Sequence, residues 1–273
     1  MSCDEFSKKE SVLKDNSSDF NKFTSDIRNE LVYVKGGDFL MGDYGEQYGP
    51  ESLPYDAKVH SKPLHKIDLN SRKGEHWRER NTTPETPAHV DYYEAEKYCH
   101  WLATVTDLPF ALPTESQWEY AARSREKFVI APTNDGTIQI KVLRGINITT
   151  ADPDIFTQKQ GTSPGKLSPM PRDARPPNPL GIYDMYDNGW EWMIDWYDPE
   201  YYKYSPVKDS RGPVNPVFKD YQGNFTKVVR SQDFSGSRRG LTITRHFSDP
   251  KNRGDLPGDK TVRCVVNSSD PVR

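Results

Sequence analysis

The sequence predicts a mixed fold of helices and short strands in which much of the chain is irregular. Two segments carry helix signals, and several short apolar runs carry strand signals. The 18 Gly and 22 Pro among 273 residues favour turns and loops between them. Only 34 % of the residues are hydrophobic while 12 % are aromatic, so we expect large aromatic side chains to fill much of the core.

Both predicted helices begin at a capping box, in which the N-cap and the third helical residue satisfy each other's backbone N–H groups. Asp91 stands three residues before Glu94, and Thr114 stands three residues before Gln117. Apolar residues at helical spacing then predict one buried face for each helix. These residues are Ala95, Tyr98, Cys99 and Leu102 in the first helix, and Trp118, Ala121 and Ala122 in the second.

Short apolar runs predict the strands, and a polar leader precedes them. We expect a strand at 31–34, a Gly36-Gly37 turn and a second strand within 35–42. Further strands are expected at 227–230, 241–245 and 261–266. Residues 1–28 lack a sustained apolar period, so we expect a flexible N-terminal tether there and a single domain at 29–273.

Charge and hydropathy exclude two classes of partner. The formal net charge is −3 with mixed signs, so no basic footprint for nucleic acid exists. No run of about 18 apolar residues is present to span a membrane. A secretory signal is also absent from the given sequence, and the three cysteines, an odd number, leave at least one thiol without an intrachain partner.

Four blocks resemble the formylglycine-generating enzyme family, also called sulfatase-modifying factors. The most specific is GIYDMYDNGWEW at 181–192, and the others lie at 32–42, at 93–102 with 112–123, and at 227–230 through 263–264. The resemblance covers nearly everything after residue 30. It implies one compact α+β domain with little regular secondary structure, distantly like C-type lectin folds.

The same resemblance implies that the family's oxidase chemistry is missing. Formylglycine-generating enzymes oxidise a substrate cysteine with O₂, using Cu(I) held by two thiolates, and soft thiolates suit Cu(I). The positions of those two cysteines carry Gly236 and Leu241 in this chain. No cysteine lies between Cys99 and Cys264, so a shifted alignment supplies no ligand. We therefore expect no copper and no such enzymatic activity.

Two structural calcium sites are implied by the family. The first uses the loop at Asn188, Gly189 and Glu191, where side chains and a carbonyl offer the oxygen atoms that Ca²⁺ prefers. The second, at a spacing that differs from the family's, draws on Asn147-Ile148 and on Asp154 and Phe156. The alternative from the residues themselves is that these Asx side chains cap turns.

The cysteines imply export in two ways. Cys99 and Cys264 match a family pair that forms a disulfide, which requires an oxidising compartment. Cys3 then stands at the head of the polar tether, as in a bacterial lipoprotein whose signal peptide has been removed. Asp4, directly after it, favours retention at the inner membrane of enteric-type bacteria. We thus expect a periplasmic domain that contacts the membrane only through a lipid anchor on Cys3.

A tethered family domain without copper ligands is most simply a protein-binding module. Some periplasmic lipoproteins that resemble this family act as immunity proteins against type VI secretion effectors, including phospholipases. We therefore expect a toxic, lipase-like effector as partner, bound at loops near 43–60, 205–222 or 250–260. The alternatives are a metal-dependent oxidoreductase with altered chemistry and an envelope module that binds glycans or peptides.

Overall fold

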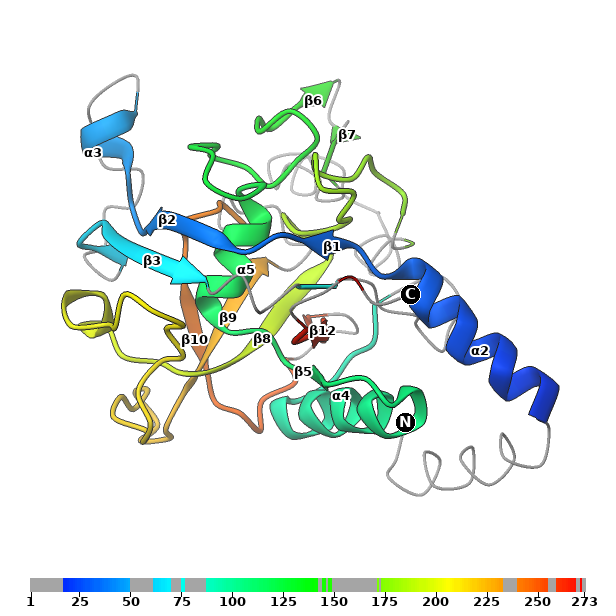
Figure 1. Ribbon diagram of the computed structural model, residues 1–273. Helices are drawn as coiled ribbons and strands as arrows, with labels where there is room; N and C mark the ends of the chain where they lie inside the picture. The colour runs from blue at the N-terminus through cyan, green and yellow to red at the C-terminus, as the bar shows by residue number, and fades with distance from the viewer. Residues whose placement is uncertain are drawn as a thin grey trace, which may run out of the picture.

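The computed structural model shows a mixed fold with little regular secondary structure, as predicted (Figure 1). It describes residues 17–49, 61–69, 75–76, 87–141, 144–145, 147–148, 171, 173–232, 240–254, 259–268 and 271. Within this part, no helix is both long and apolar enough to cross a bilayer.

A four-stranded sheet forms the centre of the domain, with the strand order β10-β9-β8-β11. The long strands β8 (Gly189–Trp196) and β9 (Lys227–Gln232) pair antiparallel in the middle. At the edges, β10 (His246–Ser248) is antiparallel to β9, whereas β11 (Lys260–Thr261) is parallel to β8.

Four two-stranded ribbons surround this sheet. They are β1 (Tyr33–Val34) with β4 (Glu75–His76), β2 (Gly37–Met41) with β3 (His65–Leu69), β5 (Phe110–Ala111) with β12 (Val265–Val266), and β6 (Ile140–Lys141) with β7 (Arg144–Gly145). Short pieces α3 (Gly45–Tyr48) and η3 (Tyr201–Lys203) complete the described elements.

Both predicted helices are confirmed with their capping boxes. In α4 (Tyr92–Thr106), the Asp91 carboxylate accepts from Glu94 N at 2.9 Å while Glu94 accepts from Asp91 N at 3.0 Å. In α5 (Glu115–Ala122), Thr114 and Gln117 exchange the same pair of bonds. The predicted apolar face of α4 is buried, but α5 is buried along all of its residues, not only along its predicted stripe.

The alternation of side chains along β8 divides the interior into two cores. Successive strand residues point to opposite faces of a sheet. Trp190 and Trp192 accordingly pack with α4, while Met193 packs with Trp118 of α5. The tryptophans around β8 are therefore core residues, and Trp118 and Trp192 are among the largest fully buried side chains.

Several predicted boundaries were wrong. A flexible tether was predicted for residues 1–28, but Ser17–Glu30 forms helix α2, and residues 1–16 lie outside the described part. Phe23 and Ile27, one helical turn apart, pack beside α4, and Phe23 lies 5.6 Å from the Trp101 ring centroid. This apolar face was not predicted, because most of the residues around it are polar.

The strand predictions were right in part. β1 and β2 exist at the predicted places, but each pairs with a distant strand and not across the Gly36-Gly37 turn. The 227–230 strand is confirmed, whereas 241–245 is a turn and β10 begins after it. The predicted strand at 261–266 is divided between β11, an edge strand of the central sheet, and β12, which pairs with β5.

Candidate functional site

The sequence motif at 181–192 spans a turn and the start of a central strand. We expected a cation-binding loop, but Gly189–Trp196 forms β8, which is buried on both faces for most of its length. The irregular part ends at Asn188, and Asp184 and Asn188 both adopt left-handed backbone conformations, with φ of 56° and 73°. The motif thus combines an irregular turn with the first residues of a central strand.

Glu191 is an ion-pair anchor within this motif. One carboxylate oxygen accepts from Trp118 Nε1 at 2.7 Å, and both oxygens accept from Arg263 Nε at 2.9 Å. Arg263 also donates to the carbonyl of Tyr183 at 3.0 Å. Glu191 therefore joins α5, β8 and the C-terminal segment, and its oxygens are already engaged by donors.

Asp184 is a half-buried carboxylate of the same turn. Desolvation and the nearby Asp187 raise the pKa of Asp184 well above its ordinary value. Its carboxylate accepts from Asn188 Nδ2 at 3.2 Å. Of the ligands predicted for the first calcium site, Asn188 thus donates to Asp184, and Glu191 accepts from Trp118 and Arg263.

The second predicted calcium site is not assembled by the described residues. The Asn147 side-chain oxygen accepts from Gln139 N at 2.8 Å, and its amide donates to the Thr137 carbonyl at 2.8 Å. Ile148 is a buried core residue, while Asp154 and Phe156 lie outside the described residues. Asn147 acts here as a turn-capping side chain, and the described part contains no group of three His, Cys, Asp or Glu arranged to hold a metal ion.

The family resemblance matches two positions, Gly236 and Leu241, to the copper-ligand cysteines, and only the second lies in the described part of the chain. Gly236 lies outside the described residues, whereas Leu241 packs against the small cluster of Ala131, Ile148 and Tyr186. The neighbouring Thr242 N donates to the Ile130 carbonyl at 3.0 Å, which fixes this turn against the same cluster. At Leu241 an apolar side chain packs where a thiolate ligand would be needed.

A disulfide joins α4 to the C-terminal segment. The sulfur atoms of Cys99 and Cys264 lie 2.09 Å apart, and the two residues are separated by 165 positions in sequence. Both residues belong to the core around Trp192, so the bridge is buried. The third cysteine, Cys3, lies outside the described residues.

Below the sheet, two glutamates of α5 hold two arginines in a fully buried network. Glu115 accepts from Arg230 Nη1 at 2.9 Å and from Arg245 Nη2 at 2.8 Å. Glu119 accepts from Arg230 Nη2 at 3.1 Å and from Gly42 N at 2.9 Å. Each charged group in this network has a counter-charge and further hydrogen bonds, so none of the four is a free acid or base. We call the network of Glu115, Glu119, Arg230 and Arg245 the clasp.

Two titratable groups beside this clasp have displaced pKa values. Burial and the nearby Glu115 raise the pKa of Asp195 to about 7, although its carboxylate accepts from Glu115 N at 2.9 Å. Burial lowers the pKa of Lys227 to about 8. Lys227 Nζ lies 4.0 Å from the Trp196 ring centroid and donates to the Ile194 carbonyl at 2.7 Å. Both side chains are buried.

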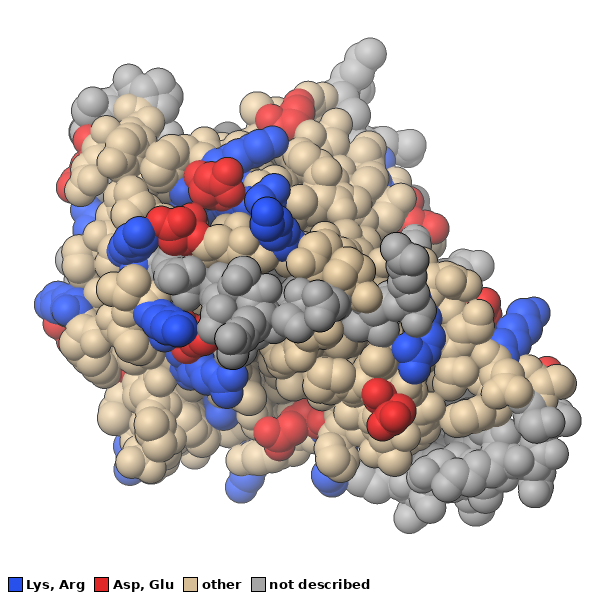
Figure 2. Space-filling model, in the orientation of Figure 1, with Lys and Arg blue, Asp and Glu red and all other residues tan. Residues whose placement is uncertain are grey.

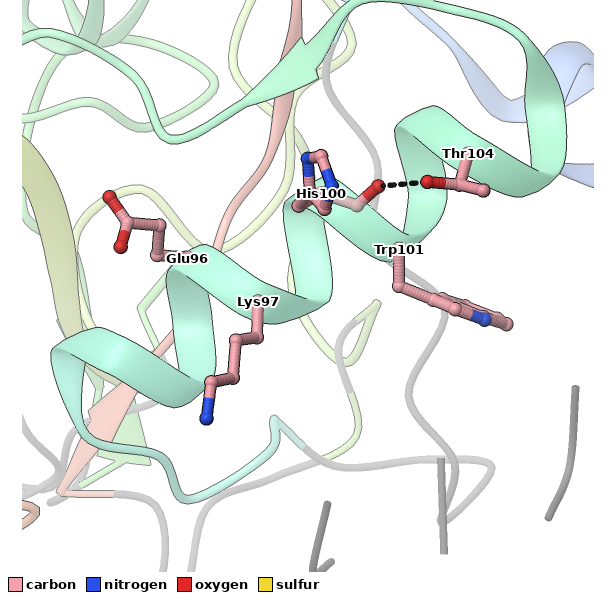
Figure 3. A pocket seen from close by; sticks show the side chains of 5 residues that line it. All are labelled: Glu96, Lys97, His100, Trp101 and Thr104. Carbon is pink, nitrogen blue, oxygen red and sulfur yellow. Dashed lines mark hydrogen bonds between the residues drawn. The ribbon is translucent and has the colours of Figure 1, made fainter. Parts of the chain in front are cut away.

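A shallow hollow of about 600 Å³ lies on the outer side of α4. Its described lining comes from one helix, and Figure 3 shows the side chains diverging along that helix. Thr104 uses its hydroxyl to donate to the His100 carbonyl at 3.0 Å. The lining, which comprises Glu96, Lys97, His100, Trp101 and Thr104, does not converge on a reacting atom.

Sequence reasoning missed the clasp and the partner of Glu191. One signal was available: Glu115 and Glu119 stand at i and i+4 on either side of Trp118, so they share a face with the core. Arg230 and Arg245 come from 115 and 130 positions away, and no local pattern links them to α5.

Comparison with known proteins identifies the domain. Residues 55–268 match the family model of the sulfatase-modifying factor enzyme 1-like domain. In the solved structures, PvdO from Pseudomonas aeruginosa is similar with a TM-score of 0.56 at 19 % identity, covering 87 % of this chain and 94 % of that one. Treponema denticola variable protein 1 gives 0.57 at 15 % identity over the same shares.

Curated relatives match over about half of the chain. A formylglycine-generating enzyme of Streptomyces coelicolor is 30 % identical over 154 residues, covering 52 % of this chain and 44 % of the relative. The mouse inactive C-alpha-formylglycine-generating enzyme 2 is 31 % identical over 184 residues, covering 67 % and 49 %. This chain spans less than half the length of these relatives. The matched family model covers most of the chain, and the chain belongs to the family of sulfatase-modifying factor enzyme 1-like domains.

Proposed function

We propose that this chain is a non-catalytic, protein-binding member of its family: an immunity protein that neutralises a secreted antibacterial effector such as a type VI phospholipase. The observation that carries the proposal is the residue pair Gly236 and Leu241, which replaces the two thiolates that the family's copper chemistry needs. The apolar packing of Leu241 supports it, because that side chain serves the core. The name of the inactive mouse relative gives further support, since it describes a family domain without the activity.

The proposed location is the periplasm, with a lipid anchor on Cys3 and inner-membrane retention through Asp4. The Cys99–Cys264 disulfide supports export, because such bridges persist in oxidising compartments. It also leaves Cys3 as the one cysteine of the sequence outside that bridge. The proposal predicts that mature protein from the native host carries the mass of a lipid on Cys3, and an unmodified thiol there would contradict this part.

A structural calcium ion belongs to the proposal at the Asp184–Gly189 turn. The half-buried Asp184 carboxylate beside Asp187 would gain from a cation, and carboxylate, amide and carbonyl oxygens are suitable ligands. We expect excess EGTA to lower the melting temperature of the wild-type protein. The melting temperature of Asp184→Asn should be the same with and without calcium. A wild-type melting temperature that EGTA leaves unchanged would contradict a structural calcium ion.

The experiment that tests the proposal needs a candidate effector, which is sought among the genes adjacent to this one in the native host. The effector is produced in the periplasm of a sensitive strain, with and without this chain carrying a signal peptide. We expect survival only when both are present, together with a stable complex of the purified proteins. Lysis that proceeds equally in both cultures, despite exported and folded protein, would overturn the proposal.

A parallel measurement separates the enzymatic alternative. The purified protein is loaded with Cu(I) and incubated aerobically with a cysteine-containing peptide, and aldehyde formation is followed by mass spectrometry. The proposal predicts no product beyond the level of copper in buffer. Turnover by the protein would favour an oxidoreductase with altered ligands.

A further inference from the structure

Exposed apolar side chains gather on one segment of the described chain, the excursion between η3 and β9, which we call the 204–225 segment. Tyr221 is 95 % exposed and Val214 is 92 % exposed. Val207 and Val217 are also exposed by more than half. Scattered exposed apolar residues are ordinary, but several on one segment mark an interaction site.

The first half of the segment is fixed to helix α5 and strand β8. The hydroxyl of Ser116 on α5 donates to the Ser210 carbonyl at 2.9 Å, and Ser210 donates to the Tyr201 hydroxyl at 3.1 Å. Gly212 has a φ of 74°, and a Cβ there would lie 2.8 Å from Cβ of Asp195, so only glycine allows this approach. The exposed residues on either side of Gly212 are therefore held in place.

The second half of the segment is fixed in the same way. Phe218 packs on Tyr197 and Phe247, with ring centroids 5.1 Å and 5.0 Å apart. The Asp220 carboxylate accepts from Gln222 N and Asn224 N, both at 2.9 Å, which closes the turn that carries Tyr221. A tyrosine presented on such a turn loses little freedom on binding, which favours affinity.

The segment carries three cations and two carboxylates, a net charge of +1 on a chain whose total charge is −3. Lys208, Arg211 and Lys219 are all exposed, and Lys219 lies 4.6 Å from the centroid of the Phe225 ring. Of the two carboxylates, that of Asp220 is used by the backbone of its own turn. Where the segment lies, Figure 2 shows mostly tan surface with blue side chains among it.

We propose that the 204–225 segment is the surface that binds the protein partner, and that the partner presents an acidic surface with an apolar centre. This inference rests on the proposed function and names the contact that would carry it. Interfaces depend on a few aromatic and arginine anchors surrounded by apolar contacts, and complementary charge steers the encounter. Tyr221 supplies an aromatic anchor here and Val214 an apolar contact, while Lys208, Arg211 and Lys219 supply the charge.

The chemistry favours a protein over a membrane surface. Peripheral membrane binding commonly uses an amphipathic helix with many cations on its polar face. The described 204–225 segment instead consists of turns with three cations, and polar side chains such as Asn215 and Gln222 are exposed between the valines. An anionic bilayer gives no specific partner for those amides, whereas a protein surface does.

The test measures binding of a catalytically inactive form of the candidate effector, by calorimetry at several salt concentrations. We expect Val214→Asp and Tyr221→Ala each to weaken binding by about tenfold or more, the range for interface anchors. Lys208→Glu with Lys219→Glu should slow association and flatten its salt dependence. Tyr93→Ala, which removes an exposed tyrosine on α4, is the matched control and should bind as the wild type does.

The outcomes separate this inference from the proposed function. Failure of the wild type to bind contradicts both. Binding by the wild type that is unchanged in the 204–225 variants overturns the inference alone. Amide hydrogen exchange in the complex supplies a test without variants, because the segment should gain protection. Loss of variant binding to phosphatidylglycerol vesicles, with effector binding intact, would replace the protein partner by a membrane.

Discussion

The α5–β8–β9 frame and the 204–225 segment are neighbours in the chain but opposite in chemistry. In the frame, charged residues are buried and paired: Glu115 holds both Arg230 and Arg245. In the segment, apolar residues are exposed: Val214 and Tyr221 have almost no cover. Each region thus reverses the usual distribution of charged and apolar side chains.

The difference teaches where to look for function in a domain of this family. The buried glutamates and arginines pair with each other, so they stabilise one arrangement of α5 against the sheet. The exposed apolar side chains of the segment are not covered by other side chains in the described part of the chain. We infer that the frame carries the family's architecture and that the segment carries the activity of this member.

The largest expected effect on stability is in the frame. Glu115→Ala removes the glutamate that pairs with Arg245 and one of the two glutamates that pair with Arg230. Breaking a buried ion pair from one side costs about 3–5 kcal/mol in free energy of unfolding. Urea denaturation measures this loss, with Glu46→Ala at the exposed Glu46–Lys62 pair as the control. A loss no greater than that of the control would show that the clasp is not a stabilising network.

The disulfide ranks next. Replacing Cys99 and Cys264 together by serine removes a bridge that closes a long loop, and such a loss costs about 2–5 kcal/mol. Thermal unfolding of the double variant should show it, and reduction of the wild-type protein should reproduce it. Equal melting of the oxidised and reduced wild type would contradict a structural bridge.

The pH dependence of stability should report on Asp195. Its pKa rises from 3.8 to about 7 on folding, so between these values the folded state binds the proton more tightly. The free energy of unfolding should therefore fall as pH rises from about 4 to about 7, by at most about 1.4 kcal/mol per pH unit. Asp195→Asn should flatten this fall in a series of thermal melts, and a wild-type profile that rises through this window would refute the assignment.

Lys227 should act in the opposite sense at higher pH. Its pKa falls from 10.5 to about 8 on folding, so the unfolded state binds the proton more tightly between these values. Stability should therefore rise as pH increases from about 8 to about 10.5. Lys227→Met keeps the length of the side chain and should remove the rise, which the same melts would record.

The smallest expected effect on stability is in the 204–225 segment. Val214→Asp and Tyr221→Ala change exposed side chains and should alter the free energy of unfolding by less than about 0.5 kcal/mol. The same variants are expected to lose binding, so urea denaturation and calorimetry on one sample sharpen the contrast. A large destabilisation would mean that the segment belongs to the frame.

Local patterns were enough to predict part of the molecule. The capping boxes at Asp91 and Thr114 fixed both helices, because those signals lie within three residues. The resemblance located the family motif at 181–192, yet it did not reveal that β8 begins at Gly189. The strand does alternate, with apolar residues at 190, 192, 194 and 196, but Glu191 and Asp195 between them were interpreted as carboxylates of a cation-binding loop.

Long-range pairings were beyond prediction from a single sequence. Glu191 was predicted as a calcium ligand from the family resemblance, and its ion pair with Arg263, which lies 72 positions away, was not predicted. The partners of β1 and β2 were missed for the same reason, since β4 and β3 follow them by tens of residues. The 204–225 segment was considered for its loop character, but its exposed anchors became evident only from the fold.

Protection of living cells tests the central claim most directly. A strain that produces the candidate effector in its periplasm is supplied with the wild-type chain, with Leu241→Ala, or with Tyr221→Ala combined with Val214→Asp. The account predicts survival with the first two and lysis with the third, at equal levels of folded protein. Survival with the 204–225 variant, or lysis with the wild type, would contradict it.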